Sequence, residues 1–165
     1  MQKCDVITGN QSLIVNYSIS ELNIESINNV NGTFYRVSIP GHTPTIVKGQ
    51  PELPVLSRLI TIPEGFDYKV RVSEIKSERI NPSGKKIKGI IYPVQEGETK
   101  EIKQNKPQFT IDKNVYATRG IIASDTVKIE PLGTVRNRKL ANLYIHPVHY
   151  NPRNNILEVI TSMKV

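Results

Sequence analysis

The chain has 165 residues and a net charge of +7, with 22% charged and 38% hydrophobic residues. This length suffices for one folded domain with a core of its own. No apolar run of about 18 residues occurs, so we expect no membrane-spanning helix. A single cysteine, Cys4, excludes an internal disulfide. The first ten residues lack the apolar segment of a signal peptide, which leaves a cytosolic protein or an exported one whose signal is absent from this sequence.

The basic residues are spread over many short segments, and the two densest groups are residues 85–88 and 136–139. Neither group is interleaved with aromatic side chains, as a surface that binds single-stranded nucleic acid would be. A solvated basic surface is the simpler interpretation. We therefore expect no nucleic-acid partner.

Alternation of apolar and polar residues predicts β-strands along most of the chain. In the first half it occurs in residues 12–20, 32–41 and 66–76, with the apolar faces Leu13, Val15, Tyr17 and Ile19; Tyr35, Val37 and Ile39; and Tyr68, Val70 and Val72. Residues 19–27 have a weak helical spacing, but their β-branched residues favour a strand.

The second half continues the pattern in residues 140–148 and 155–165. The apolar faces are Ala141, Leu143 and Ile145, and then Leu157, Val159, Met163 and Val165, with Ile156 and Ile160 on the opposite face. Turns rich in Gly, Pro and Asn separate these stretches. Short strands at this spacing predict an all-β fold, an antiparallel β-sandwich that forms a single domain over residues 1–165.

Residues 94–107 interrupt the strand pattern. Ile102 is the one large apolar residue between positions 95 and 106, and Pro93 and Pro107 bracket the segment. Long polar loops of this kind are uncommon in compact domains and are usually functional or disordered. We expect this loop to project from the sandwich.

No arrangement of residues in the sequence predicts catalysis, a metal site or a cofactor. His146 and His149 flank Pro147 in a strand-like context and are expected to point to opposite faces, which suits a shared metal poorly. The sequence has no G-x-S-x-G elbow and no phosphate-binding glycine loop. Glu96 and Glu98 lie in the polar loop, where a solvated role is expected. The chain is therefore predicted to be a binding or folding module.

Three segments carry a resemblance to a known family. They are residues 49–63 (GQPELPVLSRLITIP), residues 87–100 (IKGIIYPVQEGETK) and residues 136–165, which contain a Pro-x-x-Tyr-Asn-Pro turn between two strands. In order and spacing these segments resemble the N-terminal propeptides of the gingipain family of cysteine peptidases, peptidase family C25.

This resemblance implies a β-sandwich prodomain that assists the folding of a downstream peptidase and keeps it latent. The family's catalytic His and Cys lie in that downstream domain, so the chain itself is expected not to be an enzyme. Family members are exported by bacteria of the Bacteroidetes type, which implies a periplasmic or extracellular location without insertion into a membrane. The expected partner is the catalytic domain of a gingipain-like peptidase.

The resemblance also assigns a role to the loop at residues 94–107. In the family this loop enters the active-site cleft, and a basic residue fills the pocket for the side chain before the scissile bond (P1). Lys100 aligns best with that residue, and Lys103 is the alternative. Glu98, Thr99, Glu101 and Ile102 would be its neighbours in the cleft. A lysine here implies a partner that cleaves after lysine or accepts either basic residue.

Two assignments stay open. Arg136 and Arg138 could contact the peptidase or simply belong to a basic surface. The alternative function is a stand-alone carbohydrate-binding or adhesion module of an exported protein. Because the chain has no Trp, a sugar would stack on tyrosines such as Tyr92, Tyr116, Tyr144 and Tyr150, although core packing explains these more simply.

Overall fold

The structure is a computed structural model that describes residues 3–8, 12–62, 68–84, 89–97, 108–122, 125–136 and 138–165. Within these ranges the fold consists of strands and a one-turn helix. The elements are β1 (Lys3–Thr8), β2 (Leu13–Ser18), β3 (Asn23–Asn29), β4 (Gly32–Ser38), β5 (Thr43–Pro44), β6 (Pro54–Ile62), β7 (Ser73–Ile80), β8 (Ile90–Ile91), α1 (Lys113–Tyr116), β9 (Val127–Val135), β10 (Arg138–Ile145), β11 (Val148–Asn151) and β12 (Ile156–Lys164). Among the described residues no helix has the length and apolar character needed to cross a bilayer.

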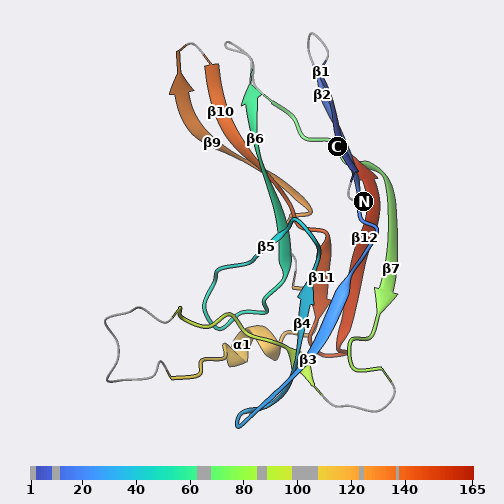
Figure 1. The fold of residues 1–165 in the computed structure, drawn as a ribbon, viewed down its shortest axis with the longest axis vertical. Coiled ribbons are helices and arrows are strands. Elements are labelled where there is room, and N and C mark those ends of the chain that lie inside the picture. The colour runs from blue at the N-terminus through green and yellow to red at the C-terminus, as the bar shows by residue number, and fades with distance from the viewer. Residues whose placement is uncertain are drawn as a thin grey trace.

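Two antiparallel sheets face each other in the upper part of the molecule (Figure 1). One has the strand order β1-β2-β12-β11, with β7 paired to β12, and the other has the order β5-β6-β10-β9. Their facing side chains form a first core, which contains Val15, Tyr17, Leu56, Leu143, Ile145, Ile160 and Met163. Burial of these apolar side chains stabilises the pair of sheets. The predicted all-β antiparallel sandwich is confirmed.

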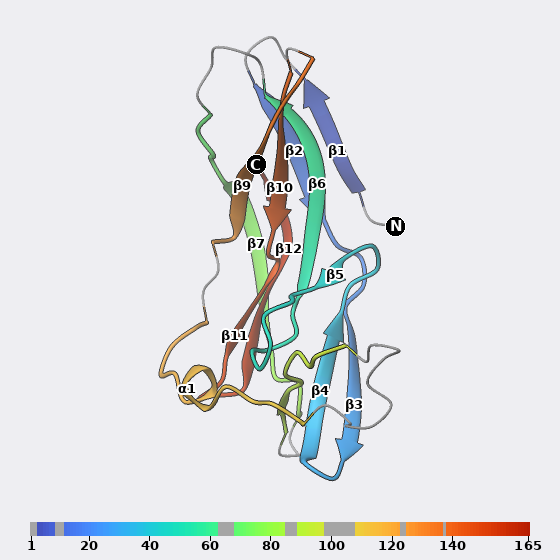
Figure 2. The ribbon, with the colours of Figure 1, turned by 90° about the vertical axis from the view of Figure 1, so that its left-hand side faces the viewer.

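A third sheet, with the order β3-β4-β8, covers the other end of the long strands (Figure 2). Its β4–β8 pair is parallel and, among the described residues, joins Phe34 to Ile90 and Tyr35 to Ile91. A second core lies here and contains Tyr35, Val37, Ile39, Leu53, Ile91, Val148, Tyr150, Leu157 and Val159. The apolar faces predicted in residues 12–20, 32–41 and 140–148 are thus buried, and residues 19–27 contribute the predicted strand, β3.

The prediction of a strand from the alternation of Tyr68, Val70 and Val72 is wrong. Residues 68–72 form no strand, Tyr68 is 45% exposed, and the strand of this region, β7, begins only at Ser73. Seven of its eight residues are exposed. A strand that pairs with a neighbour on one side only and is solvated on both faces carries no apolar alternation, so the pattern gave no signal for it.

The predicted faces of the last strand are partly wrong. Ile160 was expected opposite Met163, yet both are buried in the same core. The pairing of β12 with β7 shifts register between Ile160 and Ser162. An irregularity of this kind changes the direction of the side chains that follow, which simple alternation does not anticipate.

Candidate functional site

The six residues predicted to enter a peptidase cleft lie outside the described residues. They are Glu98, Thr99, Lys100, Glu101, Ile102 and Lys103. The structure does describe the two flanks of the loop, residues 94–97 and 108–112. These flanks form the base of the loop, and the candidate site is described from them.

The side chain of Gln95 joins the two flanks. Its Nε2 donates a hydrogen bond to the carbonyl oxygen of Thr110 at 2.9 Å, and its Oε1 accepts one from the backbone N–H of Thr110 at 2.9 Å. Nε2 also donates to the carbonyl oxygen of Pro93 at 2.8 Å. One half-buried amide thus replaces a pair of strand hydrogen bonds and fixes the distance between the two flanks.

Aromatic contacts anchor the same flanks to β4. Phe34 lies 5.6 Å from Tyr92 and 5.3 Å from Phe109, measured between ring centroids, and Tyr92 lies 6.1 Å from Phe109. The guanidinium of Arg36 lies 5.0 Å from the centroid of Tyr92 and forms an ion pair with Glu52 at 3.2 Å. Ring pairs in such geometry add about 0.5–1.5 kcal/mol beyond area burial.

The corner that begins at Gly49 also holds both flanks. The N–H of Gly49 donates to the carbonyl of Val94 at 2.8 Å, the N–H of Val94 donates to the carbonyl of Gln50 at 2.8 Å, and the N–H of Asp112 donates to the carbonyl of Gly49 at 2.9 Å. Gly49 has φ +79°, and a Cβ on it would lie 3.1 Å from the nitrogen of Asp112. Only glycine meets both conditions without strain. The Gly-x-Pro-x-Leu-Pro sequence therefore positions the base of the loop.

The Pro-x-x-Tyr-Asn-Pro turn secures β8, the strand that leads into the first flank. The buried Tyr150 donates from its hydroxyl to Oδ1 of Asn155 at 2.9 Å, and Nδ2 of Asn155 donates to the carbonyl of Gly89 at 2.7 Å. Tyr116 donates from its hydroxyl to the carbonyl of Ile91 at 2.7 Å. Burial raises the pKa of Tyr150 to about 12 and also raises the pKa of Tyr116, so both phenols remain protonated donors at neutral pH.

These contacts also decide the role of the tyrosines. Tyr150 is fully buried, while Tyr92, Tyr116 and Tyr144 are half-buried. Tyr92 lies within the aromatic cluster, and the hydroxyl of Tyr144 accepts from Nδ2 of Asn142 at 3.2 Å. They serve packing and hydrogen bonding, and they do not form an exposed surface on which a sugar could stack.

The expectation that His146 and His149 point apart is wrong. Nδ1 of His146 lies 2.9 Å from the carbonyl oxygen of Asp125, and Nε2 of His149 lies 3.3 Å from Oγ1 of Thr126. Both side chains reach one short segment because β10 ends before Pro147 and strand alternation does not continue across it. Burial lowers the pKa of both histidines. Among the described residues no three His, Cys, Asp or Glu side chains are placed to hold a metal ion.

Arg136 and Arg138 are exposed at the turn between β9 and β10. This turn lies at the opposite end of the molecule from α1, which follows directly after the second flank (Figure 1). The structure therefore does not bring the two arginines together with the base of the loop, and their contact with a peptidase stays a prediction.

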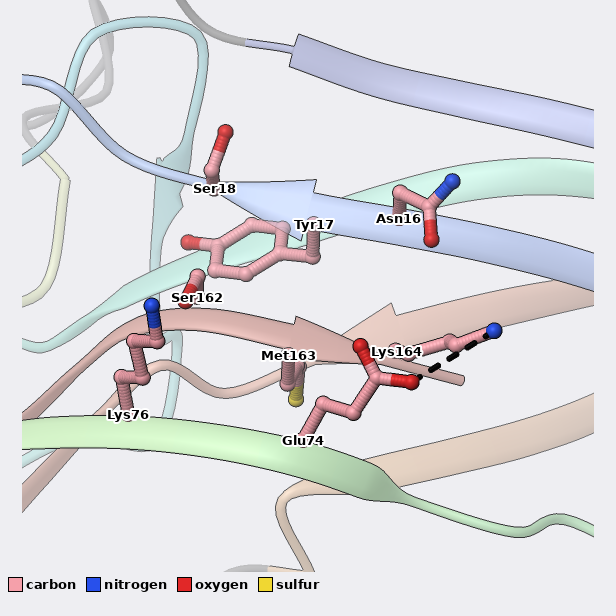
Figure 3. A pocket seen from close by; sticks show the side chains of 8 residues that line it. All are labelled: Asn16, Tyr17, Ser18, Glu74, Lys76, Ser162, Met163 and Lys164. Atoms are coloured by element: carbon pink, nitrogen blue, oxygen red, sulfur yellow. Dashed lines mark hydrogen bonds and ion pairs between the residues drawn. The ribbon is translucent and has the colours of Figure 1, made fainter.

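A pocket of about 300 Å³ opens over β12 between β2 and β7 (Figure 3). Its lining residues are Asn16, Tyr17, Ser18, Glu74, Lys76, Ser162, Met163 and Lys164. The one carboxylate among them, Glu74, pairs with Lys164 at 3.5 Å. These lining residues include no second carboxylate, histidine or cysteine that could act with Glu74 in acid–base or nucleophilic chemistry.

Comparisons with known proteins agree with this arrangement. The family model Propeptide_C25 matches residues 4–165. Lys-gingipain of Porphyromonas gingivalis (strain ATCC 33277) is 31% identical over 151 residues, which cover 90% of this chain but 9% of that protein. Lys-gingipain W83 of the same species is equally similar, and there the match covers 8% of its length. The chain thus spans a small part of the curated relatives it matches.

Solved structures share the fold. One that concerns the zymogenic latency of gingipain K from Porphyromonas gingivalis has a TM-score of 0.81 at 26% identity, over 99% of this chain and 89% of that one. The complex of pro- and mature domains of RgpB from the same species has a TM-score of 0.81 at 18% identity, over 98% and 82% of the two chains, and is a likeness of fold alone. Together with the family match, these findings show that the chain belongs to the C25 propeptide family of the gingipain-like cysteine peptidases, as a zymogen propeptide rather than a peptidase.

Proposed function

We propose that the chain binds a gingipain-like cysteine peptidase, assists its folding and keeps it latent by inserting Lys100 into the pocket that reads the P1 side chain. Lys103 is the alternative insert. The family match and the likeness to the zymogen of gingipain K support the partner class. The similarity to Lys-gingipain supports a partner that prefers lysine at P1. Because the resemblance to the gingipain family implies export, we propose that the chain acts in the periplasm or outside the cell.

The observation that carries this proposal is the fixed base of the loop. Gln95 and Thr110 share two hydrogen bonds, and Gly49 bonds to both Val94 and Asp112. A segment whose two ends are held in place loses less conformational entropy when it binds than one with free ends. Such a base favours a loop that is presented to a partner over one that is merely solvated.

Lysine suits the proposed pocket because its long apolar stem and compact cation can fill a deep slot that ends in a carboxylate. Inhibition instead of cleavage requires that the scissile carbonyl of the loop be held out of line with the nucleophile, or that the cleaved ends stay in place. A displacement of about 1 Å is enough to slow chemistry strongly. The fixed flanks offer a physical means to impose it.

Inhibition titration tests the proposal. The chain is added to the mature peptidase encoded with it, and hydrolysis of substrates with Lys or Arg at P1 is measured. Lys100→Ala should raise the inhibition constant by about 30-fold or more, the behaviour of an interface hot spot. Lys128→Ala is the matched control because Lys128 is an exposed lysine on β9. A peptidase that remains fully active with excess parent chain would disprove latency.

A folding assay tests the second role. The peptidase domain is refolded with and without the chain supplied separately, and the recovered activity is measured after the chain has been removed. Higher recovery with the chain supports assistance in folding. Equal recovery in both samples contradicts it, whatever the outcome of the inhibition titration.

A further inference from the structure

Two apolar side chains protrude from the turn between β5 and β6. Ile46 is 88% exposed and Val47 is 54% exposed, and they are adjacent in the sequence. Single exposed apolar residues are common on protein surfaces and need no explanation. Two adjacent β-branched residues at this level of exposure, on a turn that is otherwise well bonded, point to a contact surface.

The turn that carries them is rigidly built. The N–H of Thr45 donates to the carbonyl of Leu53 at 2.8 Å, and Oγ1 of Thr45 donates to the carbonyl of Pro51 at 3.0 Å while it accepts from the N–H of Leu53 at 3.1 Å. The N–H of Gln50 donates to the carbonyl of Val47 at 3.1 Å. Because β-branched side chains have few rotamers, Ile46 and Val47 are also stiff themselves. Little entropy would be lost when they are buried against a partner.

The same turn is bonded directly to both flanks of the loop. Gly49 in this turn donates to Val94 in the first flank and accepts from Asp112 in the second flank. Lys48, next to Val47, forms an exposed ion pair with Glu96. Figure 1 shows the turn before β6 beside the segment that precedes the loop. The positions of Ile46 and Val47 are therefore fixed relative to the base of the loop.

We propose that Ile46 and Val47 form a second anchor, which packs against an apolar patch on the catalytic domain of the peptidase at the rim of its active-site cleft. This inference rests on the proposed function, since it takes the same partner and the same approach. The domain that receives the loop must come within reach of the turn that is bonded to the base of the loop. The anchor would set the depth at which the loop enters the cleft.

Two other exposed apolar residues, Val30 and Leu59, have no such connection in the described part of the chain. Val30 is fully exposed at the turn between β3 and β4, and Leu59 is 63% exposed within β6. Neither has a hydrogen bond from its own turn or strand to residues 94–97 or 108–112 in the described part of the chain. They are therefore matched controls for Ile46 and Val47.

Binding to the mature peptidase tests the anchor. Affinities are measured by biolayer interferometry for the parent chain, Ile46→Ser, Val47→Ser and the control Val30→Ser, each with an unchanged thermal unfolding midpoint. Loss of a buried apolar anchor should weaken binding about tenfold or more for Ile46→Ser and somewhat less for Val47→Ser. Val30→Ser should bind like the parent. Equal affinity of Ile46→Ser, Val47→Ser and Val30→Ser would overturn the inference.

A second arm separates this inference from the loop proposal. The peptidase is covalently blocked by a small lysine-based inhibitor that fills the P1 pocket, and the same variants are compared with Lys100→Ala. The anchor predicts that Ile46→Ser still weakens the remaining binding to the blocked enzyme, while Lys100→Ala no longer has an effect. If Lys100→Ala leaves the affinity for the free enzyme unchanged but Ile46→Ser lowers it, the proposal that Lys100 is inserted is rejected and the proposed anchor is supported. The reverse pattern on the free enzyme rejects the anchor alone.

Discussion

The two ends of the molecule are held together in different ways. At the end formed by β6, β9 and β10, long ladders of backbone hydrogen bonds and the buried side chains of the first core provide the stability. The end that carries the loop base has the second core and the β3–β4 ladder, but its short irregular segments are held by individual contacts of Gly49, Gln95, Tyr116 and Asn155. The first arrangement tolerates changes in any one surface residue, whereas the second depends on particular atoms.

This difference relates to function. A loop that must be presented at a fixed position cannot be part of a ladder, because its backbone has to remain available to a partner. Its base must therefore be fixed by side chains and by neighbouring turns. Among the described residues, several side-chain to backbone hydrogen bonds around irregular structure lie at the end that carries the candidate site.

The largest effect is expected in the ladder end. Ile145 is completely buried in the first core, and Ile145→Ala should lower the free energy of unfolding by about 2–5 kcal/mol through lost burial and a cavity. Denaturant unfolding monitored by circular dichroism measures this change. Leu59→Ala, on the paired strand but 63% exposed, should change stability by less than about 0.5 kcal/mol. Similar losses for both variants would show that the core is not where the structure places it.

Gly49→Ala should have the next largest effect. It forces an alanine into positive φ and places a Cβ 3.1 Å from the nitrogen of Asp112, and together these should cost about 2–3 kcal/mol. The control is Gly84→Ala, at φ +56° with nothing within 4 Å of the new Cβ, which should cost about 1 kcal/mol. Gly49→Ala should also weaken inhibition of the peptidase more than Gly84→Ala does. Equal costs would mean that the close contact with Asp112 is not important.

Asn155→Gly tests the individual hydrogen bonds at the loop end. Asn155 has φ +51°, so glycine keeps the backbone conformation while it removes the bonds to Tyr150, Ser83 and Gly89. We expect a loss of about 1–2 kcal/mol in the free energy of unfolding. Asn154→Gly, an exposed neighbour, should have a much smaller effect. Hydrogen exchange should show that residues 89–91 open more readily in Asn155→Gly than in the parent, and unchanged protection there would contradict the assignment.

The smallest effect concerns pH. Burial lowers the pKa of His42, His146 and His149, and the nearby Arg58 adds to this for His42. Between these lowered values and the ordinary value of about 6.5, the unfolded chain binds more protons than the folded chain. The contribution of these histidines to the free energy of unfolding should therefore be fully present above this window and decrease as the pH drops through it.

Denaturant midpoints measured at several pH values between neutral and mildly acidic check this dependence. A variant with glutamine at positions 42, 146 and 149 should show a flatter profile than the parent over the same range. A parent profile that is already flat there, or a variant profile of equal slope, would assign the pH dependence to other groups.

The sequence by itself determined the strands that have one buried face and one polar face. Val15 and Tyr17, or Leu143 and Ile145, alternate with polar residues because one face of their sheet meets a core. Gly49 and the prolines after it also carried part of the family resemblance, and the structure places them in the corner at the base of the loop. The family resemblance, based on those motifs, gave the fold and the class of protein correctly.

Only the tertiary structure decided the features that arise from contacts distant in sequence. β7 has no alternation because both its faces are solvated, and Met163 shares a core with Ile160 because the pairing of β12 with β7 is irregular between Ile160 and Ser162. The role of Gln95 and the proposed role of Ile46 depend on neighbours that no local pattern reveals, Thr110 for Gln95 and the Gly49 corner for Ile46. Local periodicity reports which face of a strand is buried, whereas the position of a loop base depends on side chains that meet across the fold.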